Sequence, residues 1–327
     1  MLKLNKYLID NFFGSFFTLF SILFIIASMV LLLTISNMTA VLKIDIWEFL
    51  YLYVLSLPEI IFYTLPLTFF ITAAISIAKL FENSELITVL ALGVKPKQIT
   101  KPFFYLSIFV TILLLIITFF SIPTSQILYK NFINIKKTES QFNFTPSSIG
   151  QKLGEWNIFI EKKDKNIYKN IVLYNSDKNI LINAQTAKTL RKNNYFVLSL
   201  YKGDLYSQKD TKLSKVNFQN LELNQKISLI KLSFNTIKEY LQKYKKKTNK
   251  YLIIAFFPFI SFFFLASISF FHNRYQKNHA IIYGMVISIL YYAIAFVSYK
   301  NLYAILFIIP SFILLAKFIE KKRIKQF

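Results

Sequence analysis

The side chains of this sequence that could do acid–base or metal chemistry are few and scattered. The chain contains no cysteine and only two histidines in 327 residues, which excludes disulfides, thiolate metal sites and cysteine nucleophiles. His272 and His279 stand seven residues apart in one short loop, and two imidazoles without carboxylates or thiolates make a poor metal cage. We therefore predict no catalytic residue, no metal site and no cofactor.

Motifs for nucleotide hydrolysis and for hydrolytic catalysis are also missing from the sequence. The chain has no G-x-x-x-x-G-K-[ST] phosphate loop, no G-x-S-x-G elbow and no H-E-x-x-H zinc motif. Its apolar segments contain no paired carboxylates, so a proton relay or an ion-coupled mechanism has no groups to use. Any work that the protein performs needs an energy source on another chain.

The composition indicates a membrane protein. Hydrophobic residues make up 55% of the chain and aromatic residues 18%, well above the share that is usual in soluble proteins. The formal net charge is +23, but the basic residues are scattered and form no groove-reading motif. We expect no nucleic acid as a partner, and instead an anionic lipid or an anionic protein.

Six apolar segments are long enough to cross a hydrocarbon core of about 30 Å. They cover residues 12–35, 49–80, 103–128, 251–271, 280–299 and 302–319. The short links on one side are rich in lysine and arginine, whereas those on the other side carry only Lys43 and Lys300. By the positive-inside rule, we expect both termini to be cytoplasmic.

The second apolar segment contains a carboxylate, Glu59, which directly follows Pro58 and precedes Pro66. An ionisable residue within a span is a functional candidate because its burial is costly. The segment is longer than one crossing requires, so Glu59 could also lie at the outer interface. A structural and a functional role therefore stay open for Pro58, Glu59 and Pro66.

Between the third and fourth apolar segments, the pattern changes over about 120 residues. Stretches of alternating apolar and polar residues, separated by turns rich in Asn, Asp and Lys, occupy residues 155–163, 166–174, 179–187, 195–203 and 215–223. This spacing predicts an antiparallel sandwich or an open barrel, whose edge could pair with a partner's strand. We expect the block to be translocated, because long loops cross regardless of their charge.

Residues 82–98 form a short amphipathic segment between the second and third apolar segments. Its polar start suits a helix N-terminus, with Asn83 or Ser84 as the cap. Gly93 ends the predicted helix after about eleven residues. Two interpretations stay open: a helix lying on the lipid headgroups, or a helix that docks into a groove of a cytoplasmic partner with Glu85 as its polar anchor.

This segment resembles one in a known transporter family. Ser84 and Glu85, followed by Gly93 after the second span, look like the cytoplasmic coupling helix of LptF/LptG permeases, the membrane subunits of the lipopolysaccharide exporter. Thr88 and Leu92 share a helical stripe with Glu85. The resemblance implies that these five residues couple the chain to an ATPase.

The resemblance covers nearly the whole chain and implies its fold. That fold is an α-helical membrane protein with six transmembrane helices and a periplasmic all-β domain, like an open jellyroll, between the third and fourth. The pair Pro58-Glu59 is similar to the LptF branch more than to the LptG branch. The implied domains are residues 1–128 with transmembrane helices 1–3 and the coupling helix 82–98, residues 129–235 with the jellyroll, residues 236–250 with a connecting helix, and residues 251–327 with transmembrane helices 4–6 and a basic tail.

The resemblance also implies partners and a location. The partners would be a second permease subunit of the same family, an LptB-type ATPase homodimer, LptC- and LptA-type periplasmic β-jellyroll proteins, and lipopolysaccharide. The location would be the bacterial inner membrane. Lys43 and Lys300 are the candidates for lipid headgroup contacts, although each is equally suited to be an interfacial anchor. The first span departs from familiar members because its outer half carries no basic residue.

Two other classes of protein stay open. One is a mechanotransmitting ABC permease of the FtsX or MacB type, which has four spans and carries its outer domain after the first span rather than the third. The other is a membrane scaffold that transports nothing, with residues 82–98 lying on the bilayer.

Overall fold

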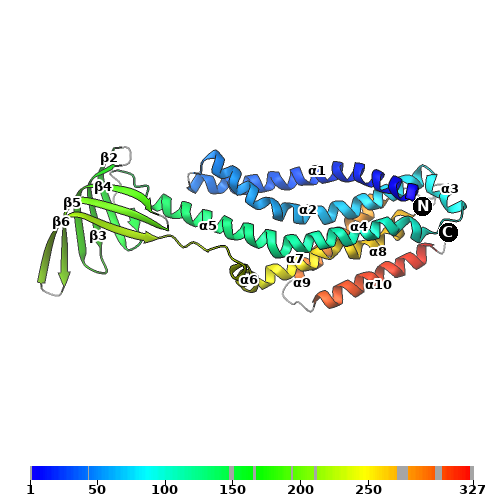
Figure 1. Cartoon of the computed structure of the whole chain (residues 1–327). Helices are drawn as coiled ribbons and strands as arrows, with labels where there is room; N and C mark the ends of the chain where they lie inside the picture. The colour runs from blue at the N-terminus through cyan, green and yellow to red at the C-terminus, as the bar shows by residue number, and fades with distance from the viewer. Residues whose placement is uncertain are drawn as a thin grey trace. The chain divides into compact units, whose positions relative to one another are not determined.

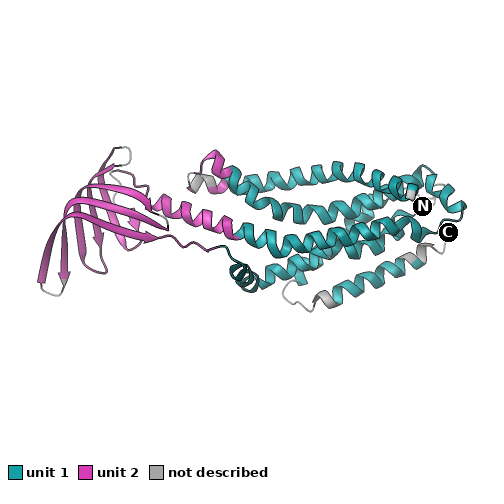
Figure 2. Ribbon diagram, in the orientation of Figure 1, with its two compact units in different colours: residues 1–36, 50–126, 232–327 teal, residues 37–49, 127–231 magenta. Residues whose placement is uncertain are grey.

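A computed structural model describes residues 2–42, 44–146, 151–164, 167–192, 194–209, 212–270, 279–298 and 304–324. The chain forms two compact units (Figure 2). Unit 1 comprises residues 1–36, 50–126 and 232–327, and unit 2 comprises residues 37–49 and 127–231.

Unit 1 is helical (Figure 1). In chain order, the helices of the structure are α1 (Leu2–Leu42), α2 (Ile46–Glu82), α3 (Glu85–Ala91), α4 (Pro96–Ile116), the π-helical turn η1 (Ile117–Ser121), α5 (Ile122–Gln141), α6 (Phe234–Lys243), α7 (Lys245–Ala255), α8 (Phe257–Ser269), α9 (Ala280–Ser298) and α10 (Ala304–Ile324). The end of α1, the start of α2 and most of α5 belong to unit 2.

Five helical stretches within the described residues are long and apolar enough to cross a membrane. They are Lys3–Met38, Ile46–Glu82, Pro96–Gln141, Lys245–Ser269 and Ala280–Ser298. A shorter apolar helix, Phe307–Ile319, lies in the sixth predicted segment, whose first residues fall outside the described part of the chain. The structure therefore agrees with a multi-pass membrane protein, and the count of six crossings stays a prediction.

Prolines alter two of these stretches. The π-helical turn η1 directly precedes the start of α5, which contains Pro123. Only Phe256 separates the end of α7 from α8, whose second residue is Pro258. A proline has no N–H to donate, and its ring clashes with the preceding helical turn. The single predicted segment 251–271 is therefore two helices, α7 and α8.

The helix of the third predicted span continues past residue 128, where the apolar run ends. The last turns of α5 are polar, and Lys136 Nζ lies 2.6 Å from Glu48 Oε1 and 2.9 Å from Glu139 Oε2. These ion pairs stabilise a helical segment that has little apolar surface to bury. The change in composition at Tyr129 therefore marks the point where the helix becomes polar, and the helix itself continues to Gln141.

The helices of unit 1 share one apolar core that centres on α2. Most α2 residues from Ile60 to Phe81 are buried. Three pairs of aromatic rings join α2 to α7, to α8 and to the residue after α8. The pairs are Phe62 with Tyr251, Phe70 with Phe257 and Phe81 with Phe270, with ring centroids 5.1, 5.6 and 4.9 Å apart. The residue numbers increase in the same direction along both segments, so α2 runs parallel to α7 and α8. We call these three ring pairs the aromatic seam.

Unit 2 contains one antiparallel sheet of six strands (Figure 1). The strands are β1 (Gln151–Leu153), β2 (Trp156–Asp164), β3 (Ile167–Asn175), β4 (Ile180–Lys192), β5 (Tyr195–Lys209) and β6 (Lys212–Lys226). Each strand pairs with its neighbours in sequence. The five predicted stretches fall on β2 to β6 and are confirmed, whereas a sandwich of two separate sheets is wrong, because the described strands form a single open sheet.

The alternation of side chains explains how this sheet builds its core. Apolar residues at every second position of β2 and β3, such as Ile158, Ile160 and Ile171, are buried, and their neighbours are mostly exposed. The segment after α5 adds Phe142 and Phe144, which contact the rings of Phe196 and Tyr168. The sheet therefore has one packed face.

Gly203 on β5 provides a test of this packing. A Cβ at this position would meet the carbonyl oxygen of Asn183, Phe218 Cζ at 2.7 Å and Ala184 Cα at 3.0 Å. We expect Gly203→Ala to destabilise the sheet by about 1–3 kcal/mol, because neighbouring backbone cannot move aside cheaply. Hydrogen exchange of the β5 amides in the full chain measures this loss.

The control for this prediction is Gly14→Ala on α1, where no described atom lies within 4 Å of the added Cβ. Alanine favours a helix by about 1 kcal/mol over glycine, so this variant keeps or gains stability. Unchanged exchange of β5 in Gly203→Ala would contradict the packing described here.

Candidate functional site

The predicted partner-binding segment folds as α3, a helix of seven residues that follows α2 (Figure 1). It is shorter than predicted, because Glu82 still belongs to α2 and Pro96 begins α4. Ser84 occupies the N-cap position, so that choice between the two predicted residues is confirmed. Its backbone has a left-handed φ of 63°, and its side chain makes no capping hydrogen bond to the described backbone. Gly93 ends the segment with a φ of 85°, which a residue without Cβ adopts readily.

Glu85 is exposed, and two side chains hold its carboxylate. The Tyr7 hydroxyl on α1 donates to Oε2 at 2.7 Å, and Asn83 Nδ2 donates to Oε1 at 3.2 Å. Asn83 therefore binds Glu85 rather than capping the helix. The bond from Tyr7 places the first turns of α1 beside α3 at one end of unit 1. Sequence reasoning missed Tyr7 because this contact spans 78 positions, and no local spacing reports it.

The remaining predicted residues of this segment lie on its exposed surface. Thr88 is exposed and its hydroxyl donates to the Ser84 carbonyl at 3.1 Å, and Leu92 is 79% exposed. On the other side of α3, Leu86 is 1% exposed and packs in the core of unit 1. The helix is thus anchored through Leu86 and presents a carboxylate and an aliphatic side chain, which suits a polar anchor with apolar contacts around it.

Glu59 on α2 is bound by side chains from α5 and α7. The Tyr251 hydroxyl donates to Oε1 at 2.6 Å, Gln126 Nε2 donates to Oε2 at 2.8 Å, and Lys247 Nζ lies 3.3 Å from Oε1. The Glu59 side chain is 28% exposed. Burial of a carboxylate is costly unless donors surround it, and these three provide them. The structural role left open by the sequence is thus supported by direct contacts.

The two prolines on either side of Glu59 lie within α2 rather than at its ends. Pro58 and Pro66 are both interior to the helix Ile46–Glu82, and Pro66 is buried. Each removes one N–H from the helical ladder. Threonine hydroxyls bond to carbonyls in this part of α2, as Thr64 does to Ile60 at 3.0 Å. Such bonds satisfy the threonine hydroxyl groups inside an apolar core.

Lys43 and Lys300, the candidates for headgroup contacts, lie outside the described residues. His272, which was not predicted to bind a metal, also lies outside them. His279 is described, is exposed, and has its ring 6.1 Å from that of Tyr283. Among the residues that the structure describes, no group of three or more His, Cys, Asp or Glu could hold a metal ion.

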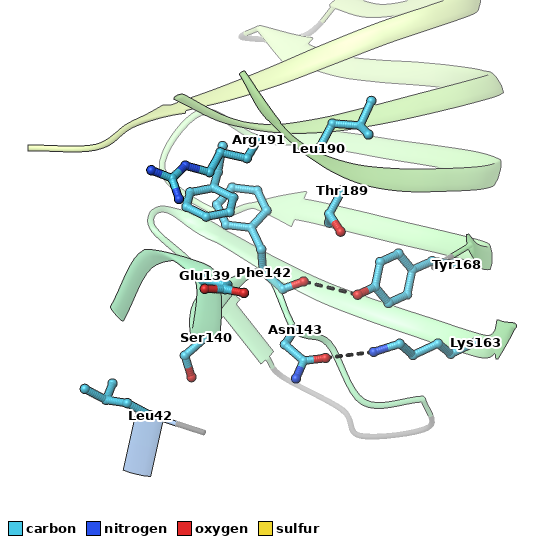
Figure 3. A pocket seen from close by; sticks show the side chains of 11 residues that line it. Leu42, Glu139, Ser140, Phe142, Asn143, Lys163, Tyr168, Thr189, Leu190 and Arg191 are labelled. Carbon is cyan, nitrogen blue, oxygen red and sulfur yellow. Dashed lines mark hydrogen bonds between the residues drawn. The ribbon is translucent and has the colours of Figure 1, made fainter. Parts of the chain in front are cut away.

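Unit 2 contains a pocket that sequence reasoning did not predict (Figure 3). Its volume is about 370 Å³. It is lined by Leu42, Glu139, Ser140, Phe142, Asn143, Lys163, Tyr168, Thr189, Leu190, Arg191 and Phe196. Lys163 Nζ donates to Asn143 Oδ1 at 2.7 Å, and the Tyr168 hydroxyl donates to the Phe142 carbonyl at 3.1 Å. No local motif could reveal this pocket, because its walls come from segments far apart in the sequence.

The described residues define a multi-pass membrane protein with an antiparallel β domain inserted between its helices and a short exposed helix after α2. Residues 6–319 match the family model of the lipopolysaccharide export system permease LptF/LptG. The chain therefore belongs to this family, whose members are transport permeases rather than enzymes. None of the curated proteins matches the chain. The family model does not separate LptF from LptG, so the preference for LptF stays a prediction.

The hydrogen bond from Tyr7 to Glu85 should stabilise the folded conformation of α3. We expect Tyr7→Phe to accelerate amide exchange in α3 about fivefold, because an exposed hydrogen bond to a carboxylate contributes about 1 kcal/mol. Tyr105→Phe, which alters an exposed tyrosine of α4, is the control and should leave α3 unchanged. Equal exchange of α3 in Tyr7→Phe and the parent chain would show that the bond does not hold α3.

Proposed function

We propose that this chain is the LptF-like permease subunit of an ATP-driven exporter that extracts lipopolysaccharide from the inner membrane and passes it to a periplasmic bridge. The observation that carries this proposal is α3, an exposed helix with a carboxylate, in a chain of the LptF/LptG family that has no phosphate loop of its own. Such a chain needs an external motor and a surface to receive it.

The motor that fits is an LptB-type ATPase homodimer on the cytoplasmic side. Glu85 would enter a groove of the ATPase as the polar anchor, with Thr88 and Leu92 at the rim of the contact. Tyr7 and Asn83 hold the carboxylate in place before the partner arrives, which lowers the cost of ordering it on binding. A chain that can hydrolyse no ATP would receive force through α3 and pass it to α2.

Lipopolysaccharide would be held between this chain and a second permease of the same family. In the most apolar 18-residue stretch of α1, only 6% of the stretch is buried within the chain. Helix α9 also exposes aliphatic residues such as Ile289. Large apolar faces of this kind need lipid or a partner helix to cover them. Lys43 and Lys300 would contact the phosphates of the headgroup.

The β domain would pass the lipid to LptC- and LptA-type jellyroll proteins through its edge. Among the described strands, β6 pairs only with β5, and it is 15 residues long and mostly exposed. An open edge of this length can accept a strand from a partner. Lys215 lies on β6, and hydrogen bonds to Tyr206 and Asp204 raise its pKa. A charged lysine on an edge strand disfavours unspecific pairing.

The proposed orientation places α3 in the cytoplasm and the sheet in the periplasm, and it can be tested directly. The natural chain has no cysteine, so single cysteines report position without background. We expect an impermeant maleimide to label Lys188→Cys on β4 in intact spheroplasts, and to label Leu92→Cys only after lysis. Labelling of Leu92→Cys from outside would overturn the orientation.

The role of α3 is tested by Glu85→Arg. We expect this variant to fold and to enter the membrane, because Glu85 is exposed, but to lose capture of the ATPase by at least about tenfold and with it export. Reversing the charge of a polar anchor replaces an attraction by a repulsion. Co-purification of the ATPase and transfer of lipopolysaccharide measure the two effects.

The matched control is Glu82→Arg, the same change of charge at the last residue of α2 and outside α3. Its capture of the ATPase should stay close to that of the parent chain. Full complementation of export by Glu85→Arg would refute the coupling role of α3 and leave the scaffold as the better explanation.

A further inference from the structure

We infer that Glu59 is a positioning residue that fastens α7 to α2, so that motion received at α3 is passed along α2 to the helices that lead to the β domain. The inference rests on the proposed function, because it assumes that force enters at α3. It concerns a cluster that we call the Glu59 clasp, made of Glu59, Gln126, Lys247 and Tyr251.

The two ends of the proposed path lie on the same helix. α2 runs unbroken from Ile46 to Glu82, and only Asn83 and Ser84 separate it from α3. Glu59 lies 23 residues before Glu82, which corresponds to about 35 Å of helix. Because α2 is largely buried from Ile60 onward, it moves together with its neighbours rather than alone.

The clasp joins α2 to the two helical segments that precede and follow the six-stranded sheet in the chain. Gln126 is the residue at which the chain leaves unit 1 along α5. Lys247 and Tyr251 lie on α7, which is preceded by α6 and, through residues 227–233, by β6. One carboxylate therefore accepts bonds from the outgoing and from the returning segment, at 2.8 and 2.6 Å.

The surroundings of the clasp restrict its motion further. Tyr251 is 3% exposed, and its ring also belongs to the aromatic seam through Phe62. Lys250 Nζ lies 4.5 Å from the ring centroid of Phe296 on α9. The Tyr292 hydroxyl, also on α9, donates to the carbonyl of Tyr63 on α2 at 3.0 Å. Four helices thus meet at this point, and the charged groups lie at the end of the seam farthest from α3.

A contact that served stability alone would not need a carboxylate here. Apolar packing continues along the rest of the seam, and the Glu59–Lys247 pair is only partly buried, so an apolar residue in its place could keep the stability of the bundle. A charged centre with several donors instead specifies one register between α2, α5 and α7. If α2 lost its register with α5 and α7, the ATPase would still hydrolyse ATP, but less lipid would be moved for each ATP hydrolysed.

The test is Glu59→Gln in the whole complex, reconstituted in proteoliposomes with purified lipopolysaccharide and an LptA-type acceptor. We expect ATPase capture and ATP hydrolysis to stay within about twofold of the parent complex. Lipid transfer per ATP should fall about tenfold, which is the fold-change that corresponds to a typical coupling energy between linked sites. Tyr251→Phe keeps the ring of the seam and removes one donor, so it should reduce the same ratio to a lesser degree.

The matched control is Glu48→Gln, which breaks a different Glu–Lys pair of α2, with Lys136 at 2.6 Å, and does not touch α7. It should leave transfer per ATP unchanged. An unchanged ratio in Glu59→Gln, or an equal fall in Glu48→Gln, would overturn the inference. If Glu59→Gln does not fold, Tyr251→Phe decides by the same ratio. Absence of any ATPase from the parent complex would instead refute the proposed function itself.

Discussion

The packing of α2 against α7 and α8 is the interaction on which the rest of unit 1 depends. Aromatic rings join the helices along their length, and the carboxylate of Glu59 closes the seam at one end with donors from Tyr251, Gln126 and Lys247. Because a carboxylate in an apolar bundle is tolerated only where donors surround it, this end of the seam has one arrangement. The other end of α2 leads directly into α3.

In the proposed function, α3 is the surface on which an ATPase on another chain would act. α3 is anchored in the core by Leu86 and tied to α1 by the bond between Tyr7 and Glu85, while its exposed surface stays available. A force applied to α3 would therefore act on α2, which is closely packed in the core of unit 1. The six-stranded sheet follows in the same chain, with an open edge at β6, and the membership of the LptF/LptG family connects these parts to lipopolysaccharide export.

Local patterns in the sequence predicted the elements of this structure well and its long-range contacts poorly. The alternation of β2 to β6 and the apolar run of α9 are local properties, and both were found. The left-handed Ser84 was missed because backbone strain at a cap leaves no pattern in residue types. The bonds of Glu85 to Tyr7 and of Glu59 to Tyr251 span 78 and 192 positions, and only the folded chain brings them together.

In the proposed function, α3 meets a nucleotide-hydrolysing protein rather than the membrane surface, and crosslinking in living cells distinguishes these two surroundings. A photoreactive amino acid in place of Leu92, which is 79% exposed, samples whatever covers this helix. We expect a crosslink to a single ATPase subunit, which disappears when Glu85 is replaced by Arg. Crosslinks to lipid alone, unaffected by Glu85→Arg, would show that α3 lies on the membrane surface and does not bind an ATPase.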